Sequence, residues 1–313
     1  MNNQMATRPQ GEVGARQQPK FSVAITTDGY KKLINNTLGD PNRAKRFVAA
    51  ITSAVAVNPA LQECEAGTIL AGALLGESLN LSPSPQLGQF YLVPFKSKAK
   101  YDRQGNLIKP ETVQAQFILG YKGYIQLAIR SGQYRKLNVV EVKAGELVEF
   151  DPMNEEIVCD FIRDYNQRKD APTIGYYATF EYLNGFRKAI YWSKEEMMDH
   201  ADKYSAAFSA SAYRKILDGQ IPEKDMWKYS SFWYKNFDDM AKKTMLRQLI
   251  SKWGIMSTEL QQAFVNDGSL TEIGANNEIV TTPEEQLPAI QAPEPIVDAA
   301  DPVEVPQISM DDI

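Results

Sequence analysis

The first part of the chain carries apolar residues at helical spacing. Asp40-Pro41 is typical of a helix N-cap followed by proline at the first helical position. The residues after it predict a helix that ends near Asn58-Pro59, with an apolar face formed by Phe47, Val48, Ile51, Ala54 and Val55. A second helix is predicted over 63–79. Because it is almost wholly apolar after Ala66, we expect it to be buried.

From Gly88 the pattern becomes typical of strands. The segment 89–95 is aromatic and β-branched, and the turn cluster 102–106 separates it from a second strand-like segment, 107–119. A short helix over 121–130 follows. Further strands are predicted around 137–142, 147–150, 157–162, 174–182 and 186–192, the last two flanking the hairpin signal Asn184-Gly185.

Helices return in the last third. Ser193 and Glu196 form a capping-box pattern that begins a helix through about Lys203. Further helices are predicted over 225–235, over 238–253 with Gly254 as C-cap, and over 258–265. This order predicts an α+β fold, in which helices flank an antiparallel β-meander or hairpin core with one inserted helix.

Composition divides the chain into three parts. The net charge of the 313 residues is −5, which at first sight argues against nucleic-acid binding. However, residues 266–313 hold 11 of the 39 acidic residues and 6 of the 17 prolines, and no Lys, Arg or aromatic. Without them, 34 basic residues stand against 28 acidic ones, a net +6. We therefore predict a disordered arm (1–28), a folded domain (29–265) and a disordered, acidic, Pro-rich tail (266–313).

Several functional classes lack their usual residues. No run of 18 apolar residues predicts a membrane span, and the N-terminus lacks the apolar stretch of a signal peptide. The cysteines Cys64 and Cys159 form no disulfide framework, which indicates the reducing cytoplasm. With a single histidine, His200, no spaced carboxylate set and no phosphate-binding GxxxxGK[ST] loop, we expect no cofactor, no metal site and no catalytic centre.

Lysines at alternate positions mark the first candidate surface. Lys96, Lys98 and Lys100 would project from one face of a strand, and Arg103 and Lys109 lie at or just past the following turn. A hairpin with a basic face neutralises phosphates without reading bases. An edge strand protected from aggregation by lysines explains the same pattern.

The predicted helix 121–130 carries the second candidate surface. Lys122, Gln126 and Arg130 form one polar stripe, while Ile125, Ala128 and Ile129 are expected to face the core. Gly120 and Gly123 would leave the helix start open for close approach, and free N–H groups there favour an anion, although a simple turn explains them equally well.

Charge changes sharply along the middle of the sequence. Residues 96–143 contain ten Lys and Arg against three acids, whereas 144–170 contain eight acids against three bases. Either this is random surface variation, or the positive segment binds a polyanion while the negative one faces a basic surface of a neighbouring subunit. The second interpretation predicts salt-sensitive self-association.

A third candidate surface lies on the predicted helix 238–253. It carries Lys242, Lys243 and Arg247, beside an apolar set that includes Met245 and Leu249. A solvated face of a packed helix explains these cations as well as a binding surface does. Among the nearby aromatics, Tyr101 and Tyr121 are candidates for base stacking or for groove walls.

Three blocks resemble the RecT family of phage single-strand annealing proteins, related to Redβ. They are Gly88-Gln-Phe-Tyr-Leu-Val-Pro-Phe95, Gly120-Tyr-Lys-Gly-Tyr-Ile-Gln-Leu-Ala-Ile-Arg-Ser-Gly132 and Lys242-Lys-Thr-Met-Leu-Arg-Gln-Leu-Ile250. They occur in the family's order, and the resemblance covers roughly residues 30–265. It implies an ATP-independent, non-catalytic protein that binds single-stranded DNA, pairs it with its complement and assembles into rings or helical filaments.

The resemblance also implies sites and partners. The domain 29–265 would oligomerise and would bind DNA. The residues implied in DNA binding are Lys96, Lys98, Lys100, Lys122, Arg130, Lys242, Lys243 and Arg247, with Tyr101, Arg103, Lys109 and Tyr121 as further candidates. A phage exonuclease is the implied partner. The end of the tail, 308–313, resembles the acidic tip of bacterial single-strand-binding proteins, so it either contacts host proteins or only solubilises. A metal-dependent nuclease and an oligomeric phage structural protein remain the alternatives.

Overall fold

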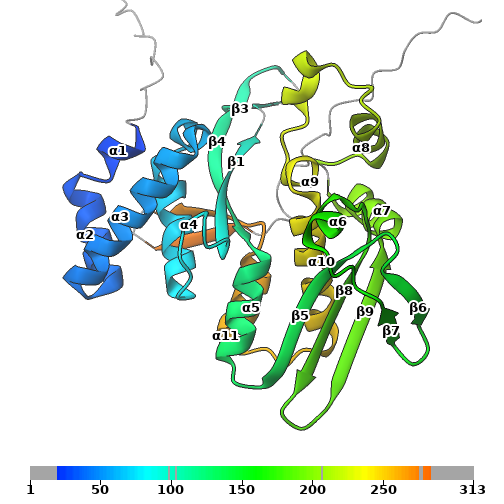
Figure 1. Ribbon diagram of the computed structural model, residues 1–313. Helices are drawn as coiled ribbons and strands as arrows, with labels where there is room; N and C mark the ends of the chain where they lie inside the picture. Colours follow the sequence, from blue (N-terminus) through cyan, green and yellow to red (C-terminus); the bar gives the residue numbers. More distant parts are fainter. Residues whose placement is uncertain (1–19, 98, 103, 206, 275–277, 283–313) are drawn as a thin grey trace, which may run out of the picture.

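The structure, a computed structural model, describes residues 20–97, 99–102, 104–205, 207–274 and 278–282. Its N-terminal part is helical (Figure 1). Asp40 caps the helix α3, because its carboxylate accepts hydrogen bonds from the backbone N–H groups of Asn42 and Arg43. The elements of this part are α1 (Phe21–Ala24), α2 (Asp28–Leu38), α3 (Pro41–Val57), the 3-10 helix η1 (Pro59–Glu63) and α4 (Ala66–Ser78).

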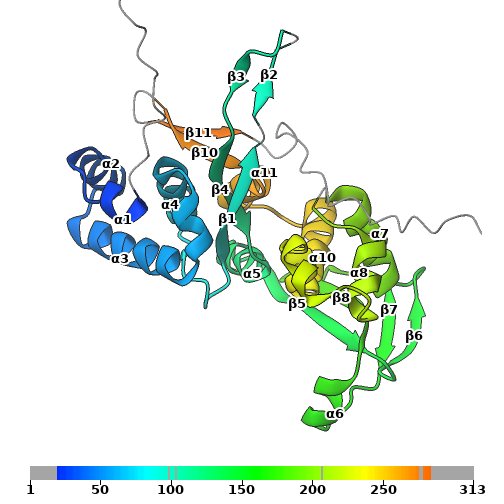
Figure 2. The same cartoon turned by 90° about the horizontal axis from the view of Figure 1, so that it is seen from above.

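A four-stranded antiparallel sheet packs against α4. It has the order β1-β4-β10-β11, formed by β1 (Phe90–Ser97), β4 (Thr112–Leu119), β10 (Leu270–Ile273) and β11 (Ile279–Thr282). Side chains of α4 and β1 interlock, since a Cβ on Gly76 would lie 2.3 Å from the ring of Phe90. Between β1 and β4, the strands β2 (Lys100–Tyr101) and β3 (Leu107–Lys109) form a hairpin that projects from the rest (Figure 2).

A second antiparallel sheet has the order β5-β8-β9. Its strands are β5 (Tyr134–Lys143), β8 (Thr173–Tyr182) and β9 (Arg187–Ser193). The connection from β5 to β8 contains a separate hairpin, β6 (Leu147–Asp151) with β7 (Glu156–Cys159), and the short helix α6 (Tyr165–Asp170). The helix α5 (Tyr121–Arg130) joins the two sheets.

The C-terminal helices cover and connect the two halves. α10 (Phe237–Trp253) contacts α5 and all three strands of the second sheet, and one hydrophobic core runs through both halves. Because eight of its residues are buried, α10 is a core helix rather than a surface one. The remaining elements are α7 (Lys194–Tyr204), α8 (Ala210–Leu217), η2 (Glu223–Lys228), α9 (Phe232–Lys235) and α11 (Thr258–Asn266).

The α+β class and the antiparallel pairing are confirmed. The capping box of Ser193 and Glu196 is present, with both reciprocal hydrogen bonds. Two details were wrong. The helix predicted over 225–235 is two short pieces, η2 and α9, and Ile129, expected to face the core, is exposed while Tyr124 and Leu127 fill that role.

Both expected domain boundaries also move outward. Phe21 is buried in α1, so the folded part begins before residue 29. After residue 265, Asp267, Leu270 and Thr271 are buried, and β10 pairs with β4 at Leu270 and Gln116. The segment 266–282, expected to belong to a disordered tail, thus contains a strand of the first sheet. The remainder of the expected tail, 283–313, and most of the expected arm lie outside the described residues.

The described residues contain neither a candidate membrane-spanning helix nor a candidate metal cluster. None of the helices in that part of the chain is both long and apolar enough to cross a membrane. No three His, Cys, Asp or Glu side chains there lie close enough together to hold a metal ion.

Candidate nucleic-acid interface

The three sequence blocks come together in the fold. The first block forms β1, the second forms α5, and the third lies within α10. The start of α5 sits against the start of β1, and α10 packs on α5 from the other side. The residues that bring them together decide which cations remain available for a ligand.

The two glycines of the second block are packing residues. The N–H of Gly120 donates to the carbonyl of Gln89 at 2.9 Å. A Cβ on Gly120 would lie 2.2 Å from the carbonyl oxygen of Gly88, and one on Gly123 would lie 2.1 Å from that of Gln89. Another segment does approach this helix start closely, as expected, but that segment is the backbone of Gly88 and Gln89. The two glycines therefore serve a contact within the chain, and an anion at this helix start stays a prediction.

A buried carboxylate, Asp267, joins α5, α10 and β4. Its Oδ1 accepts hydrogen bonds from the backbone N–H of Leu119 at 2.9 Å and from Lys243 Nζ at 2.8 Å. Its Oδ2 accepts from the Tyr124 hydroxyl and from Arg247 Nη1, each at 2.9 Å. Four donors thus satisfy one carboxylate that is cut off from water, which is the condition under which a buried charge is tolerated.

Burial and charge act in opposite directions on this cluster. Burial alone would raise the pKa of Asp267, but the adjacent Lys243 and Arg247 outweigh it and hold that pKa below its usual value. For Tyr124, burial first and the Asp267 carboxylate second raise the pKa of the hydroxyl. Tyr124 therefore stays protonated and donates its hydrogen bond, while Asp267 stays ionised.

This arrangement changes the interpretation of Lys243 and Arg247. They do share a helix face, but that face packs on Asp267 rather than on solvent. Lys243 is only 9% exposed and pairs with Asp267, and its contact with phosphate stays a prediction. Arg247 keeps part of its guanidinium exposed beyond its contact with Asp267, so it can still reach a ligand.

Lys242 is also held by neighbouring side chains. Its Nζ lies 2.9 Å from Asp239 Oδ1 and 3.1 Å from Glu141 Oε1, and 4.9 Å from the centre of the Tyr121 ring. Burial would lower its pKa, but the two carboxylates outweigh burial and raise the pKa of Lys242 to about 12. Its charge is therefore present but largely neutralised, and Tyr121 is half-buried beneath it.

Arg130 serves the fold at the other end of α5. Its Nη1 and Nη2 donate to the backbone carbonyls of Leu79 at 2.8 Å and Asn80 at 2.6 Å. These contacts secure the turn that follows α4, where Asn80 adopts a left-handed conformation with φ 51°. In the polar stripe of Lys122, Gln126 and Arg130, the last residue therefore binds the protein's own backbone.

Lys96 and Lys122 remain available. Both side chains are exposed, and neither forms an ion pair with any residue that the structure describes. Lys122 borders a shallow depression together with Gln86, Gln89 and Gln126. Lys96 lies at the other end of β1, about 23 Å along the strand from Gln89.

Of the other predicted cations, the projecting hairpin contains Lys100 and Lys109. Lys100 and Lys109 are cross-strand partners in β2 and β3, so their backbones lie side by side, but their side chains are not described. Lys98 and Arg103 lie outside the described residues. Since β1 ends at Ser97 and β2 begins at Lys100, the three lysines do not share one continuous strand. Tyr101 is exposed on this hairpin.

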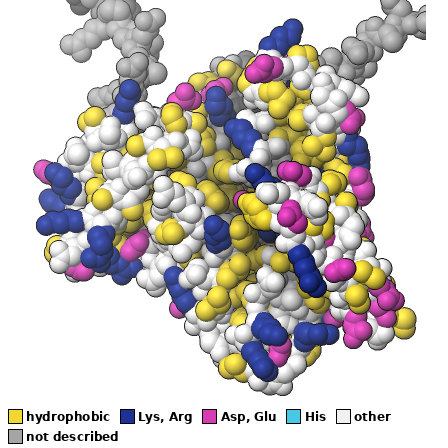
Figure 3. All heavy atoms as spheres, viewed as in Figure 1, with side chains coloured by type: hydrophobic (Ala, Val, Ile, Leu, Met, Phe, Trp, Pro, Cys, Tyr) yellow, Lys and Arg dark blue, Asp and Glu magenta, His cyan; other side chains and the backbone are white. Residues whose placement is uncertain are grey.

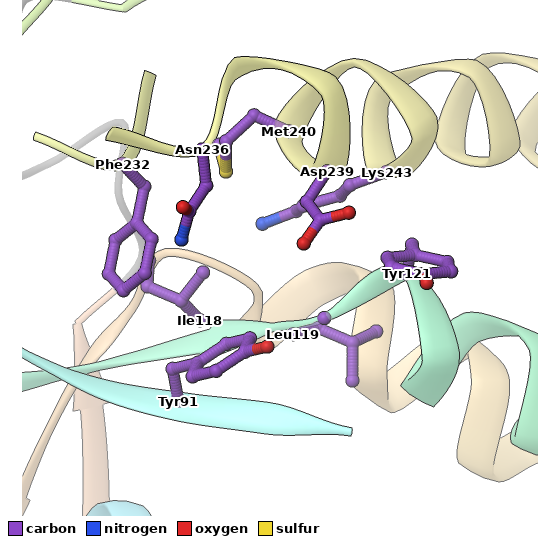
Figure 4. A pocket seen from close by; sticks show the side chains of 10 residues that line it. Tyr91, Ile118, Leu119, Tyr121, Phe232, Asn236, Asp239, Met240 and Lys243 are labelled. Carbon is purple, nitrogen blue, oxygen red and sulfur yellow. The ribbon is translucent and has the colours of Figure 1, made fainter. Parts of the chain in front are cut away.

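A pocket between β1 and α10 contains residues that the sequence analysis missed. Tyr91 of β1 and Phe232 of α9 approach each other, with ring centres 5.5 Å apart. Asn236 and Asp239 lie on the same side of the pocket as Phe232, across from Tyr91 (Figure 4). Tyr121 borders the same pocket. Burial, and then the nearby Asp239 carboxylate, raise the pKa of Tyr91. Tyr91 belongs to the first block, three residues after Gly88, and this position in the block could have indicated it from the sequence.

Figure 3 shows a hollow between the part with β1, β4 and α5 and the part with α9 and α10, with dark blue side chains beside it. The two walls thus combine cations with aromatic rings. Such a lining suits a polyanion with aromatic bases, such as single-stranded nucleic acid, better than a small apolar ligand.

Comparison with known proteins identifies the family. The sequence profile of the RecT family matches residues 45–282. The chain is 33% identical to Uncharacterized protein YqaK of Bacillus subtilis (strain 168), over 79% of this chain and 72% of that protein. It is 26% identical to Protein RecT of Escherichia coli (strain K12), over 72% of this chain and 71% of that protein. The profile ends at the last residue of β11 and includes Asp267, and the chain belongs to the RecT family.

Proposed function

We propose that this protein binds single-stranded DNA and anneals complementary strands without ATP, in homologous recombination of a phage, within the cytoplasm. It acts as a homo-oligomer, a ring or a helical filament, and holds the duplex product as it forms. One observation carries this proposal. The RecT family profile spans residues 45–282, and the three blocks that the sequence shares with the family meet at one hollow of the fold.

The cations proposed to contact phosphates are Lys96 and Lys122, which form no ion pair with a described residue, together with Lys98, Lys100, Arg103 and Lys109. Lys242 and Arg247 contribute from the α10 side, although carboxylates share their charge. Tyr101 and Tyr121 are proposed to stack on bases or to line the groove. Lys243 and Arg130 act by holding the groove in shape.

The proposed mechanism needs no bond-making chemistry. Two DNA strands repel each other through their phosphates, so a protein that neutralises one strand makes the approach of its complement less costly. Lysines that contact only phosphates leave the base edges free to pair. A groove with cations along its walls and aromatic rings at its base, such as Tyr91 and Tyr121, meets both requirements.

Partners beyond DNA belong to the same proposal. A phage exonuclease would supply the single strands, and a host single-strand-binding protein would cover them. The segment 308–313 is the candidate contact for host proteins, and it lies outside the described residues. Annealing of protein-coated DNA, but not of bare DNA, would then depend on this segment.

The test follows pairing directly. Two complementary dye-labelled oligonucleotides are mixed with the full-length protein without nucleotide, beside a non-complementary pair, and the strands are examined afterwards on a denaturing gel. We expect accelerated pairing of the complementary strands, no pairing of the others, and intact DNA. Cut strands would replace the proposal with a nuclease activity. A protein that assembles but neither binds DNA nor accelerates pairing would instead have a structural role.

A further inference from the structure

One end of the molecule presents exposed apolar side chains. They lie on the β6–β7 hairpin and on α6, where Val148, Met153 and Tyr165 are 65%, 92% and 76% exposed. Val158 and Phe161 of the same region are also exposed. Several large exposed apolar side chains within one stretch of chain, residues 148–165, make this stretch a candidate protein interaction site. The exposed side chains of residues 148–165 are called the hairpin face below.

This region is held firmly at its base. Glu146 is fully buried there, and its carboxylate accepts hydrogen bonds from Arg168 Nε at 2.6 Å and from the N–H of Lys143 at 2.8 Å. Arg168 also donates to the carbonyl of Glu141 at 2.9 Å, and Phe150 packs on Tyr191 of β9. A two-stranded hairpin alone is marginal in water, so these contacts fix the hairpin face as a defined surface.

Acidic residues surround the hairpin face. Within residues 144–170, eight acids stand against three bases. The exposed acids are Glu149, Glu156, Asp160, Asp164 and Asp170. Figure 3 shows Asp and Glu side chains gathered at the lower right of the molecule, where Figure 1 places β6 and β7. Because this surface is negative, DNA is repelled from it, and its occupant must be a protein with a basic surface.

The opposite end of the molecule has such a surface. α2 and α3 lie at the far side from β6 and β7 in Figure 1, and they expose Lys31, Lys32, Lys45 and Arg46. Residues 20–57 carry six bases against two acids. None of these four cations forms an ion pair with a described residue. Val23 and Val57 add exposed apolar area. This surface is called the helical face.

We propose that the hairpin face of one subunit docks on the helical face of the next copy of the chain. The two faces differ from each other, so the contact is head-to-tail, and repeating it gives a ring or a helical filament rather than a closed dimer. Since the faces lie at opposite ends, the hollow between them stays open and passes from subunit to subunit. This inference rests on the proposed homo-oligomer and specifies the surfaces that build it.

Charge exchange provides the test. One variant carries Glu149→Lys, Glu156→Lys and Asp160→Lys on the hairpin face, and a second carries Lys31→Glu, Lys32→Glu and Lys45→Glu on the helical face. A control variant reverses three exposed acids elsewhere, Asp218, Glu223 and Glu259. Particle size is measured by light scattering and electron microscopy with and without oligonucleotide, and folding is checked by circular dichroism.

We expect each face variant alone to remain monomeric, because its two faces then carry charges of similar sign. An equimolar mixture of the two variants should assemble again, since each meets an opposite face on the other. The control variant should assemble like the original protein. Raising the salt concentration from 50 to 500 mM should reduce assembly of the original protein several-fold.

A second measurement does not depend on charge reversal. A photo-crosslinking residue placed at Met153 should link to peptides within residues 20–57 of another subunit, whereas one placed at the exposed Leu217 should not. Crosslinks that map to any other segment would overturn the proposed pairing of faces.

The remaining outcomes separate this inference from the proposed function. Variants that assemble as the original protein does, or a mixture that fails to assemble, would overturn the head-to-tail contact while leaving annealing untouched. A helical-face variant that assembles normally but binds DNA less tightly would assign that face to DNA instead. An original protein that stays monomeric in every condition would remove the homo-oligomer itself.

Discussion

Lys243 Nζ lies 2.8 Å from Oδ1 of Asp267, and both side chains are buried. Through this contact, α10 holds the segment between α11 and β10, and Asp267 in turn holds Tyr124 of α5 and the end of β4. A basic residue from a block that resembles DNA-binding proteins thus acts first on the shape of the groove.

Replacing Asp267 with Asn should destabilise the protein. The change leaves Lys243 buried without its counter-charge, and breaking a buried pair in this way costs about 3 kcal/mol or more. Urea unfolding at pH 7 measures the loss. As a matched control, Glu195→Gln removes a carboxylate that pairs with Arg214 at 2.7 Å on the surface, and it should cost far less. Equal losses from the two variants would contradict the structural role of Asp267.

The same carboxylate should make stability depend on pH. The pKa of Asp267 is lowered in the folded state, because Lys243 and Arg247 outweigh the effect of burial. Its contribution is therefore fully present above the unfolded-state pKa of about 3.9, and it is lost as the pH falls through the folded-state pKa. The difference in unfolding free energy between the original protein and Asp267→Asn should be constant from pH 7 to 5 and shrink below pH 4. A difference that grows on acidification would reverse the assigned sign.

Lys122→Ala should weaken DNA binding without affecting the fold. Lys122 is exposed and unpaired among the described residues, so its loss should reduce the slope of log affinity against log salt concentration by about 0.7 on single-stranded DNA. Lys96→Ala should behave likewise. Lys215→Ala, an exposed lysine of α8, is the control and should leave the slope unchanged. Lys243→Ala should instead lower the unfolding free energy. A slope unaltered by Lys122→Ala would remove that residue from the groove.

Gly120→Ala should disrupt the junction between β1 and α5. The new Cβ would lie 2.2 Å from the carbonyl oxygen of Gly88, so the backbone must shift, and we expect lower stability together with weaker DNA binding. Gly29→Ala in α2 meets nothing within 4 Å, and it should be neutral or should stabilise by about 0.5–1 kcal/mol. Thermal melting of both variants makes the comparison. A fully stable Gly120→Ala protein would show that the approach of the two segments is not required.

Truncation should reveal where the folded part ends. Removal of 283–313 keeps β10 and β11, and we expect its melting temperature to match that of the full chain. Removal of 267–313 also takes away Asp267 and the buried Leu270. Lys243 then loses its ion-pair partner, and β4 loses the strand β10 that pairs with one of its edges. We expect that shorter protein to be unfolded or much less stable by circular dichroism. If the two truncated proteins were equally stable, the folded domain would end at residue 265, as the sequence predicted.

Local patterns were sufficient for most of the elements. The capping of α3 by Asp40, the capping box at Ser193 and the span of α5 all depend on residues within a few positions of one another, and all three agree with the structure. The family could also be recognised from the three blocks, because their order and their amino-acid sequences can be compared without knowledge of tertiary contacts. The split of the strands into two sheets depends on long-range pairing, and no local pattern specified it.

The candidate site divides in the same way. From the sequence alone came the α+β class, the family and the position of the cations along the chain, all of which are properties of local spacing and residue type. The tertiary structure decided which cations are available to a ligand. Lys243, Arg130 and Lys122 look alike in sequence, yet Asp267 neutralises the first and backbone carbonyls hold the second, whereas the third forms neither an ion pair nor a side-chain hydrogen bond with a described residue. The physical reason is that a charge is buried or exposed according to partners far away in sequence, and Asp267 came from a segment whose composition alone predicted disorder.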